Sequence, residues 1–140
     1  MLRQIDKVLY TAHTHTAGGR DGTGRSSDGF LDVRLSPPGS NRPGTNPEQL
    51  FGVGYSACFI GAMRRAGAPL GIRLPDDVSV DAEVSLGNTA DQGFALAVKL
   101  NVTLPGLTSE QKRQLVHGAH QLCPYSHATR GNIDVQFDIR

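Results

Sequence analysis

The stretch Thr45–Pro69, TNPEQLFGVGYSACFIGAMRRAGAP, predicts a helix that is apolar on every side. Asn46 is a good N-cap, Pro47 suits the first helical turn, and Glu48 favours the positive end of the helix dipole. The helix is expected to end near Gly67, because a proline follows shortly after it. Small or apolar residues fill nearly every position between these ends, and a helix that is apolar all round is a buried one. We therefore expect this helix to lie at the centre of the fold.

On the C-terminal side of this helix, alternating apolar residues predict three strands around a second helix. The segments VSVDAEVSL (78–86) and FALAVKLNVTL (94–104) alternate without a break on either side of a turn-like segment, which indicates an antiparallel hairpin with one buried face. The tail NIDVQFDIR (132–140) repeats the alternation. Between them, LTSEQKRQL opens an amphipathic helix, and Thr108 with Gln111 fits a capping box at its start.

On the N-terminal side, two strand-like segments flank a glycine-rich loop. KVLYTAHTHT (7–16) and GFLDVRL (29–35) are the strands, and AGGRDGTGRSSD (17–28) is the loop. The order ββ–α–ββ–α–β predicts an α+β architecture with antiparallel sheets and two main helices, in a single domain over residues 1–140. A subunit of this size can hardly surround a helix that is apolar everywhere, so we expect a homodimer in which two copies share a core.

Composition and charge exclude several classes of protein. The 140 residues carry a formal net charge of +1, which gives no reason to expect nucleic acid or an anionic membrane as a partner. No apolar run approaches the ~20 residues of a membrane span. The start MLRQIDKVLYTAHTHT lacks the apolar core of a secretory signal. We therefore expect a cytoplasmic protein, in which a disulfide usually means redox chemistry.

The two cysteines, Cys58 and Cys123, lie on the expected buried faces of the two helices. One interpretation is that both are inert buried thiols, since free cysteine is among the most buried residue types. The other is that the crossing helices bring them together, for which Cα atoms ~5.5–6 Å apart would allow a disulfide. Cys123 directly precedes Pro124 at a helix end, where the backbone can adjust. A thiol in a rigid helix and one at an adjustable end suit a reversible attack-and-resolve pair.

Other candidate sites are weaker. His13 with His15, and His117 with His120, each place two rings on one side of an element, but neither pair has a second pair of ligands at zinc-motif spacing, so no metal is expected. The loop GGRDGTG lacks the GxxxxGK[ST] pattern of a phosphate loop, and a tight turn explains its glycines. Arg20 on this loop could nevertheless lie against another element.

Three segments, AGGRDG, NPEQLFGVGYSACF and CPYSHATRGNIDV, together resemble the signature segments of the organic hydroperoxide resistance branch of the OsmC/Ohr family. The resemblance covers essentially the whole chain in the right order. It implies an intertwined α+β homodimer and thiol peroxidase activity on organic hydroperoxides. Cys58 resembles the peroxidatic cysteine, Cys123 the resolving cysteine, and Arg20 and Glu48 the pair that activates the thiol. His127 stands where the family pattern leads us to expect asparagine.

The resemblance also implies a catalytic cycle without a bound cofactor. The Cys58 thiolate would attack the peroxide and become a sulfenic acid, and Cys123 would condense with it to a disulfide. An external dithiol, dihydrolipoamide or a lipoylated protein, would then reduce the disulfide. Apolar residues near Cys58 are candidate walls of the substrate pocket and favour alkyl or lipid hydroperoxides; they are Leu50, Phe51, Phe59 and Met63.

Two alternatives to this function stay open. One is an OsmC-like peroxidase with a broader range of peroxides. The other is a non-enzymatic dimeric binding module for an apolar ligand, in which the same buried helices form the binding site and the cysteines take no part.

The spacing of the expected site residues raises a geometric question. Glu48 and Cys58 lie ten residues apart on one predicted helix, about 15 Å along its axis, which one arginine side chain cannot bridge. Either the helix breaks near Gly52 and Gly54, or each site combines the two cysteines of one subunit with the arginine and glutamate of its partner. We expect the shared site.

Overall fold

The helix predicted around Cys58 is present as α1, which spans Pro47–Gly67 in a computed structural model that describes residues 2–140. The chain divides where this helix begins, into a first unit up to Pro47 and a second unit, Glu48–Arg140. α1 starts at the predicted proline, carries Glu48 in its first turn, and runs without interruption to the predicted glycine. The prediction of this helix and of both its ends is therefore confirmed.

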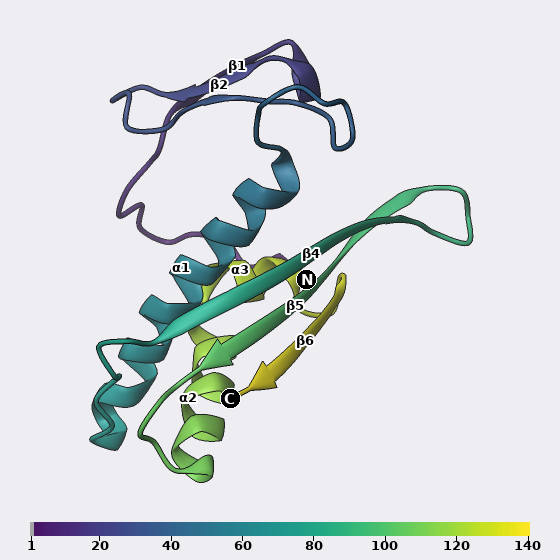
Figure 1. The fold of residues 1–140 in the computed structure, drawn as a ribbon. Helices are drawn as coiled ribbons and strands as arrows, with labels where there is room; N and C mark the ends of the chain where they lie inside the picture. The colour runs from purple at the N-terminus through teal and green to yellow at the C-terminus, as the bar shows by residue number, and fades with distance from the viewer. Residues whose placement is uncertain (1) are drawn as a thin grey trace. The chain divides into compact units, whose positions relative to one another are not determined.

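The second unit consists of a three-stranded sheet with helices on one face (Figure 1). Its strands, in spatial order, are β4 (Ser79–Asn88), β5 (Phe94–Thr103) and β6 (Asp134–Ile139). A 3₁₀ turn, Ala68–Leu70, follows α1. In the sequence, the helices α2 (Ser109–Leu122) and α3 (Pro124–Thr129) come between β5 and β6. β4 and β5 form the predicted antiparallel hairpin, whose turn extends past the helices (Figure 1).

β6 differs from the prediction, because it pairs with β5 in the parallel direction. The expected sheet was antiparallel throughout. α2 and α3 carry the chain back to the end of the sheet where β5 began, and a crossover of this length is what a parallel pair requires. The second unit is therefore an α+β arrangement with a mixed sheet.

The core of the second unit lies between the sheet and the helices. β5 contributes the fully buried Leu100 and Val102, and α1 contributes the fully buried Tyr55 and Phe59. α2 adds a stripe at helical spacing that comprises Leu115, Val116 and Ala119. Burying these alternating and helical stripes against one another is the main favourable contribution to folding.

Within one chain, α1 buries only one of its faces. Val53 is 71% exposed and Leu50 37% exposed, whereas Tyr55 and Phe59 have no exposed surface. A single chain therefore leaves apolar residues of α1 uncovered, as expected for a subunit of this size.

Close packing of the helices depends on two glycines. A Cβ atom at Gly118 of α2 would lie 2.8 Å from the Cβ of Ala66 in α1, so these two helices touch at their small residues. A Cβ atom at Gly54 of α1 would lie 2.6 Å from the hydroxyl oxygen of Tyr125 in α3. Larger residues at either position would push the helices apart.

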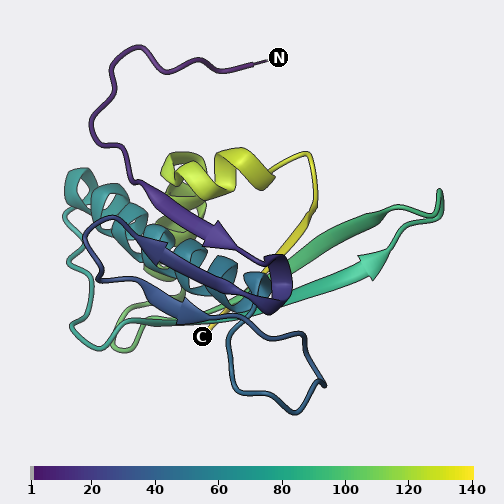
Figure 2. The same ribbon diagram turned by 90° about the horizontal axis from the view of Figure 1, so that it is seen from above.

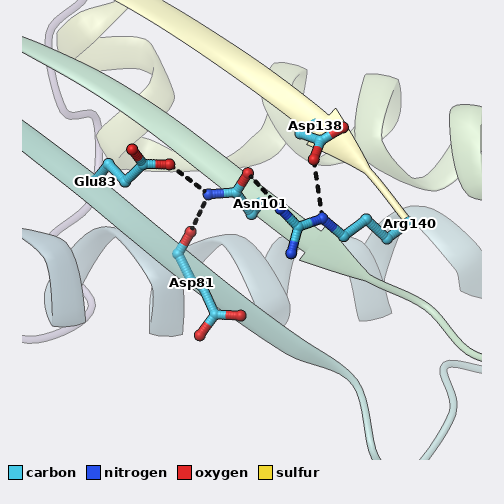
Figure 3. Close-up of polar contacts among 5 residues, drawn as sticks. All are labelled: Asp81, Glu83, Asn101, Asp138 and Arg140. Atoms are coloured by element: carbon cyan, nitrogen blue, oxygen red, sulfur yellow. Dashed lines mark hydrogen bonds and ion pairs between the residues drawn. The ribbon is translucent and has the colours of Figure 1, made fainter.

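The face of the sheet opposite the helices carries a polar network across all three strands (Figure 3). The side chain of Asn101 in β5 donates to the backbone carbonyl of Asp81 at 3.0 Å and to the carboxylate of Glu83 at 2.9 Å. Arg140 donates to the Asn101 side-chain oxygen at 3.3 Å and to Asp138 at 2.9 Å. Asn101 is only 4% exposed, and these hydrogen bonds satisfy its buried side-chain amide.

The first unit is a small antiparallel sheet of three strands in the order β1 (Thr14–Ala17), β2 (Thr23–Ser26) and β3 (Asp32–Arg34), as Figure 2 shows. β1 is shorter than the strand predicted at 7–16. β2 lies in the segment expected to be a loop, so the prediction missed one strand. The reason is that Gly18, Gly19 and Gly29 adopt positive φ angles and let the chain reverse twice within a few residues.

Among the described residues, 2–140, no helix combines the length and the apolar character that crossing a membrane requires.

Candidate active site

The two cysteines of the chain are in contact. The Cys123 thiol donates to the Cys58 sulfur with 3.3 Å between the two sulfur atoms, and both cysteines are free thiols. Cys58 lies in the middle of α1 and is half-buried, whereas Cys123 lies between α2 and α3 and has no exposed surface. Residues from separate parts of the sequence are thus brought to a distance from which a disulfide could form after a small movement.

The backbone at Cys123 is held on both sides. Cys123 is the C-cap of α2 and the N-cap of α3, with φ −69° and ψ 122°. Its N–H donates to the Ala119 carbonyl at 2.8 Å, and its own carbonyl accepts from the His127 N–H at 2.9 Å. Pro124 begins α3, which the sequence did not predict as a helix. Cys123 therefore lies at the end of α2, as predicted, but the chain enters a second helix at once.

The surroundings of Cys58 disfavour its thiolate. Burial raises the pKa of the Cys58 thiol above its ordinary value, and the neighbouring Cys123 raises it further through its hydrogen bond and its charge. A hydrogen bond from the backbone N–H of Tyr125 acts in the opposite direction. A cation close to the sulfur is needed if Cys58 is to ionise readily near neutral pH.

A buried hydroxyl network lies one helical turn from the cysteines. The Tyr55 hydroxyl in α1 is hydrogen-bonded to Ser126 Oγ at 2.8 Å and to Thr129 Oγ1 at 3.1 Å, both in α3. Ser126 Oγ is also hydrogen-bonded to His120 Nδ1 of α2 at 2.9 Å. None of these four residues was singled out from the sequence for this role. The available signal was their spacing, since Tyr55 precedes Cys58 by three residues and Ser126 follows Cys123 by three.

The residues predicted as pocket walls fall into two groups. Leu50 is 37% exposed, and the ring of the half-buried Phe51 lies 5.8 Å from the ring of Tyr125. Phe59 and Met63 have no exposed surface and belong to the hydrophobic core. Cys58 packs against this same core, and the assignment of the two residues as pocket walls stays a prediction.

Arg20 and Glu48 belong to different units of the chain. Arg20 is exposed and lies in a 3₁₀ turn, Gly19–Asp21, of the first unit. In this turn Asp21 forms an ion pair with Arg42 at 2.5 Å. Glu48 is half-buried in the first turn of α1. Because α1 is continuous from Pro47 to Gly67, a break between Glu48 and Cys58 is excluded.

The histidines are spread over separate elements. His13 and His15 lie at β1, and His117 and His120 lie on α2. His127 is exposed in α3. Within residues 2–140 no three side chains of histidine, cysteine, aspartate or glutamate are grouped as a metal ion would require.

The sequence and the fold can be compared with those of known proteins. A model of the OsmC-like protein family matches residues 38–138. The chain is 51% identical over 138 residues to an organic hydroperoxide resistance protein of Xanthomonas axonopodis pv. citri (strain 306), covering 96% of each chain. The chain therefore belongs to the OsmC/Ohr family.

Solved structures agree with this assignment. The crystal structure of the organic hydroperoxide resistance protein OhrB of Bacillus subtilis is similar with a TM-score of 0.89 and 41% identity, over 95% of this chain and 100% of that one. An organic hydroperoxide resistance protein of Legionella pneumophila is similar with a TM-score of 0.87 and 43% identity, over 95% and 98% of the two chains. The fold is thus the α+β fold of organic hydroperoxide resistance proteins, as the sequence motifs predicted.

Proposed function

We propose that this protein is a thiol peroxidase that reduces organic hydroperoxides to alcohols, with Cys58 as the attacking and Cys123 as the resolving thiol. The observation that carries the proposal is the 3.3 Å separation of the two sulfur atoms. Membership of the OsmC/Ohr family and relatives named for organic hydroperoxide resistance support it. The difference in exposure between the two cysteines supports the roles, because the half-buried Cys58 can meet a substrate and the buried Cys123 cannot.

The cycle consists of three balanced steps. The Cys58 thiolate attacks the distal oxygen of ROOH, the O–O bond breaks, and the alkoxide leaves as ROH after taking a proton. Cys58 is now a sulfenic acid, and attack by the Cys123 sulfur expels water and forms the disulfide. A dithiol then supplies two electrons and two protons, which restores both thiols. Dihydrolipoamide or a lipoylated protein is the proposed reductant, and no bound cofactor takes part.

Activation of Cys58 is assigned to Arg20. Since burial raises the pKa of the Cys58 thiol, a guanidinium beside the sulfur would have to offset that penalty. Lowering a pKa by two units takes about 2.7 kcal/mol of differential interaction. Glu48 would fix the arginine through a bidentate pair.

The proposed site is shared between two copies of the chain. Glu48 and Cys58 are separated by about 15 Å along the continuous α1, more than one arginine can bridge. We therefore assign Cys58 and Cys123 to one subunit, and the arginine and glutamate of each site to the other. The exposed apolar residues on α1, such as Val53, support a homodimer because a second copy would cover them.

The substrate class follows from the apolar residues near Cys58. Leu50 and Phe51, together with the Tyr125 ring, would contact an alkyl chain. At ~0.8 kcal/mol per buried CH₂, three or four methylenes give roughly a hundredfold preference over hydrogen peroxide.

The test is peroxide consumption by the purified protein. Turnover is measured with tert-butyl hydroperoxide and with hydrogen peroxide, each with dihydrolipoamide and with thioredoxin as reductant. We expect rapid turnover of the alkyl peroxide with dihydrolipoamide. Equal efficiency with both peroxides would instead favour a peroxidase of broader range, and no consumption with any pair would favour a binding module.

A further inference from the structure

The two thiols are not the only link between α1 and the α2–α3 junction. α3 has only six residues, and its first turn supplies both the Tyr125 N–H that contacts Cys58 and the Ser126 side chain. Ser126 has no exposed surface and is hydrogen-bonded to Tyr55 of α1 and to His120 of α2. The hydroxyl network thus joins the same elements as the cysteine contact, one turn away from it.

The network ties α3 to both neighbouring helices, α1 and α2. Ser126 is bound to α1 through Tyr55 and to α2 through His120, and Thr129 at the end of α3 is bound to Tyr55 as well. Thr129 Oγ1 also donates to the Ser126 carbonyl at 3.3 Å. Among the described residues, no buried side-chain nitrogen or oxygen lacks a hydrogen-bond partner. Loss of the Ser126 hydroxyl therefore removes a hydrogen-bond partner from Tyr55 of α1 and from His120 of α2.

Formation of the disulfide requires the cysteines to move. The sulfur atoms are 3.3 Å apart, and a disulfide bond is about 2.05 Å long. Side-chain rotation can supply part of this approach, but the Cys123 backbone cannot shift independently, because hydrogen bonds tie its N–H to α2 and its carbonyl to α3. Any backbone movement in the approach therefore involves the α2–α3 junction as a whole, and the Ser126 network holds that junction in its starting position.

We propose that Ser126 is a positioning residue for disulfide formation, which holds Cys123 against Cys58 through its hydrogen bonds to Tyr55 and His120. This inference rests on the proposed peroxidase function. It assigns Ser126 to the second step, in which the Cys123 sulfur displaces water from the Cys58 sulfenic acid. The first step, the attack of Cys58 on the peroxide, uses none of the hydroxyl groups of the network. If α3 is loosened, the sulfenic acid persists and a second peroxide oxidises it to sulfinic acid.

The experiment separates the two steps in Ser126→Ala protein by single turnover with one equivalent of tert-butyl hydroperoxide. Trapping of the sulfenic acid with dimedone reports the first step, and the loss of two hydrogens in intact mass reports the disulfide. We expect the first rate to stay within twofold of wild type and disulfide formation to slow at least tenfold. With excess peroxide, the sulfinic fraction should increase. Ser85→Ala, at an exposed serine of β4, is the matched control and should behave as wild type.

A second variant distinguishes loss of the hydrogen bond from a folding defect. Tyr55→Phe keeps the buried ring and removes only the hydroxyl, and it should also slow the second step alone. The double variant should be little slower than Ser126→Ala, because both changes break the same link. Equal slowing of both steps, or an unchanged second step in a variant that melts as a folded protein, would overturn the proposal. If wild-type protein forms no disulfide at all, the proposed function itself fails, which is a different result.

Discussion

The sulfur atoms of Cys58 and Cys123 lie 3.3 Å apart although one residue is embedded in a long helix and the other joins two short ones. The two thiols differ sharply in exposure, with Cys123 fully buried. In the proposed cycle, this difference favours Cys58 as the attacking thiol, since a peroxide would reach the half-buried sulfur more easily than the buried one.

Substitution of each cysteine tests this direction. Cys58→Ser should abolish peroxide reduction, because the attacking thiol is lost. Cys123→Ser should still permit one attack and leave Cys58 as a sulfenic or more highly oxidised acid. Mass spectrometry after one equivalent of peroxide locates the oxidised residue in each variant. First oxidation at Cys123 would reverse the assignment.

Subunit mixing tests the shared site. Cys58→Ser and Arg20→Ala proteins should each be inactive, but a heterodimer of the two should contain one site with its cysteines from one chain and its arginine from the other. Activity should therefore return when the two proteins are mixed under conditions that exchange subunits. Exchange is followed separately by native mass spectrometry of differently tagged chains. A mixture that remains inactive despite exchange places the whole site in one chain.

Two helical glycines should respond to alanine in opposite ways. At Gly118 the new Cβ would lie 2.8 Å from the Cβ of Ala66, so Gly118→Ala should destabilise the protein by about 1–3 kcal/mol through overpacking. At Gly61 a Cβ has no atom within 4 Å, and Gly61→Ala should stabilise α1 by about 0.5–1 kcal/mol. Urea unfolding measures both free energies. A stabilised Gly118→Ala protein would contradict the close contact of α1 and α2.

Stability should decrease in mild acid because of His120. Burial lowers the pKa of His120, and the positive charges of Arg130 and His117 lower it further. The unfolded chain, with a histidine pKa of about 6.5, then binds more protons than the folded chain. The contribution of neutral His120 is complete above that value and is lost as the pH falls through it toward the lower folded pKa.

The urea midpoint at pH 7.5 and at pH 5.5 measures this contribution. His120→Gln should show a smaller difference between the two midpoints than wild type. His13→Gln, at an exposed position of the first unit, should keep the wild-type difference. An unchanged difference in His120→Gln would show that other groups cause it.

Elements specified by neighbouring residues could be predicted from the sequence. The second helix is an example, since Thr108 and Gln111 form both hydrogen bonds of the predicted capping box, at 3.1 and 3.0 Å. The direction of β6 could not be predicted in this way, because alternation shows which face of a strand is buried but not which way its neighbour runs. The short β2, TGRS, has too few apolar residues to indicate a strand.

The residues of the candidate site also differ in whether the sequence alone could identify them. Cys58 and Cys123 could be found because their motifs are distinctive, and the contact between them follows from the crossing of two helices. Tyr55 and Ser126 could not, since a tyrosine in an apolar helix is usually a core residue and a serine after a helix is usually part of a turn. Only the tertiary structure brings their hydroxyl groups together at 2.8 Å.

The full burial of Cys123 behind a half-buried Cys58 has a consequence for chemical modification of this protein. A small thiol-directed electrophile added to the native protein can reach only the cysteine of α1, so labelling should stop at one group per chain until the fold is opened. The attached group would then occupy the space beside the Tyr125 backbone and separate the two sulfur atoms. A covalent inhibitor directed at this single sulfur would thus block peroxide entry and disulfide closure together.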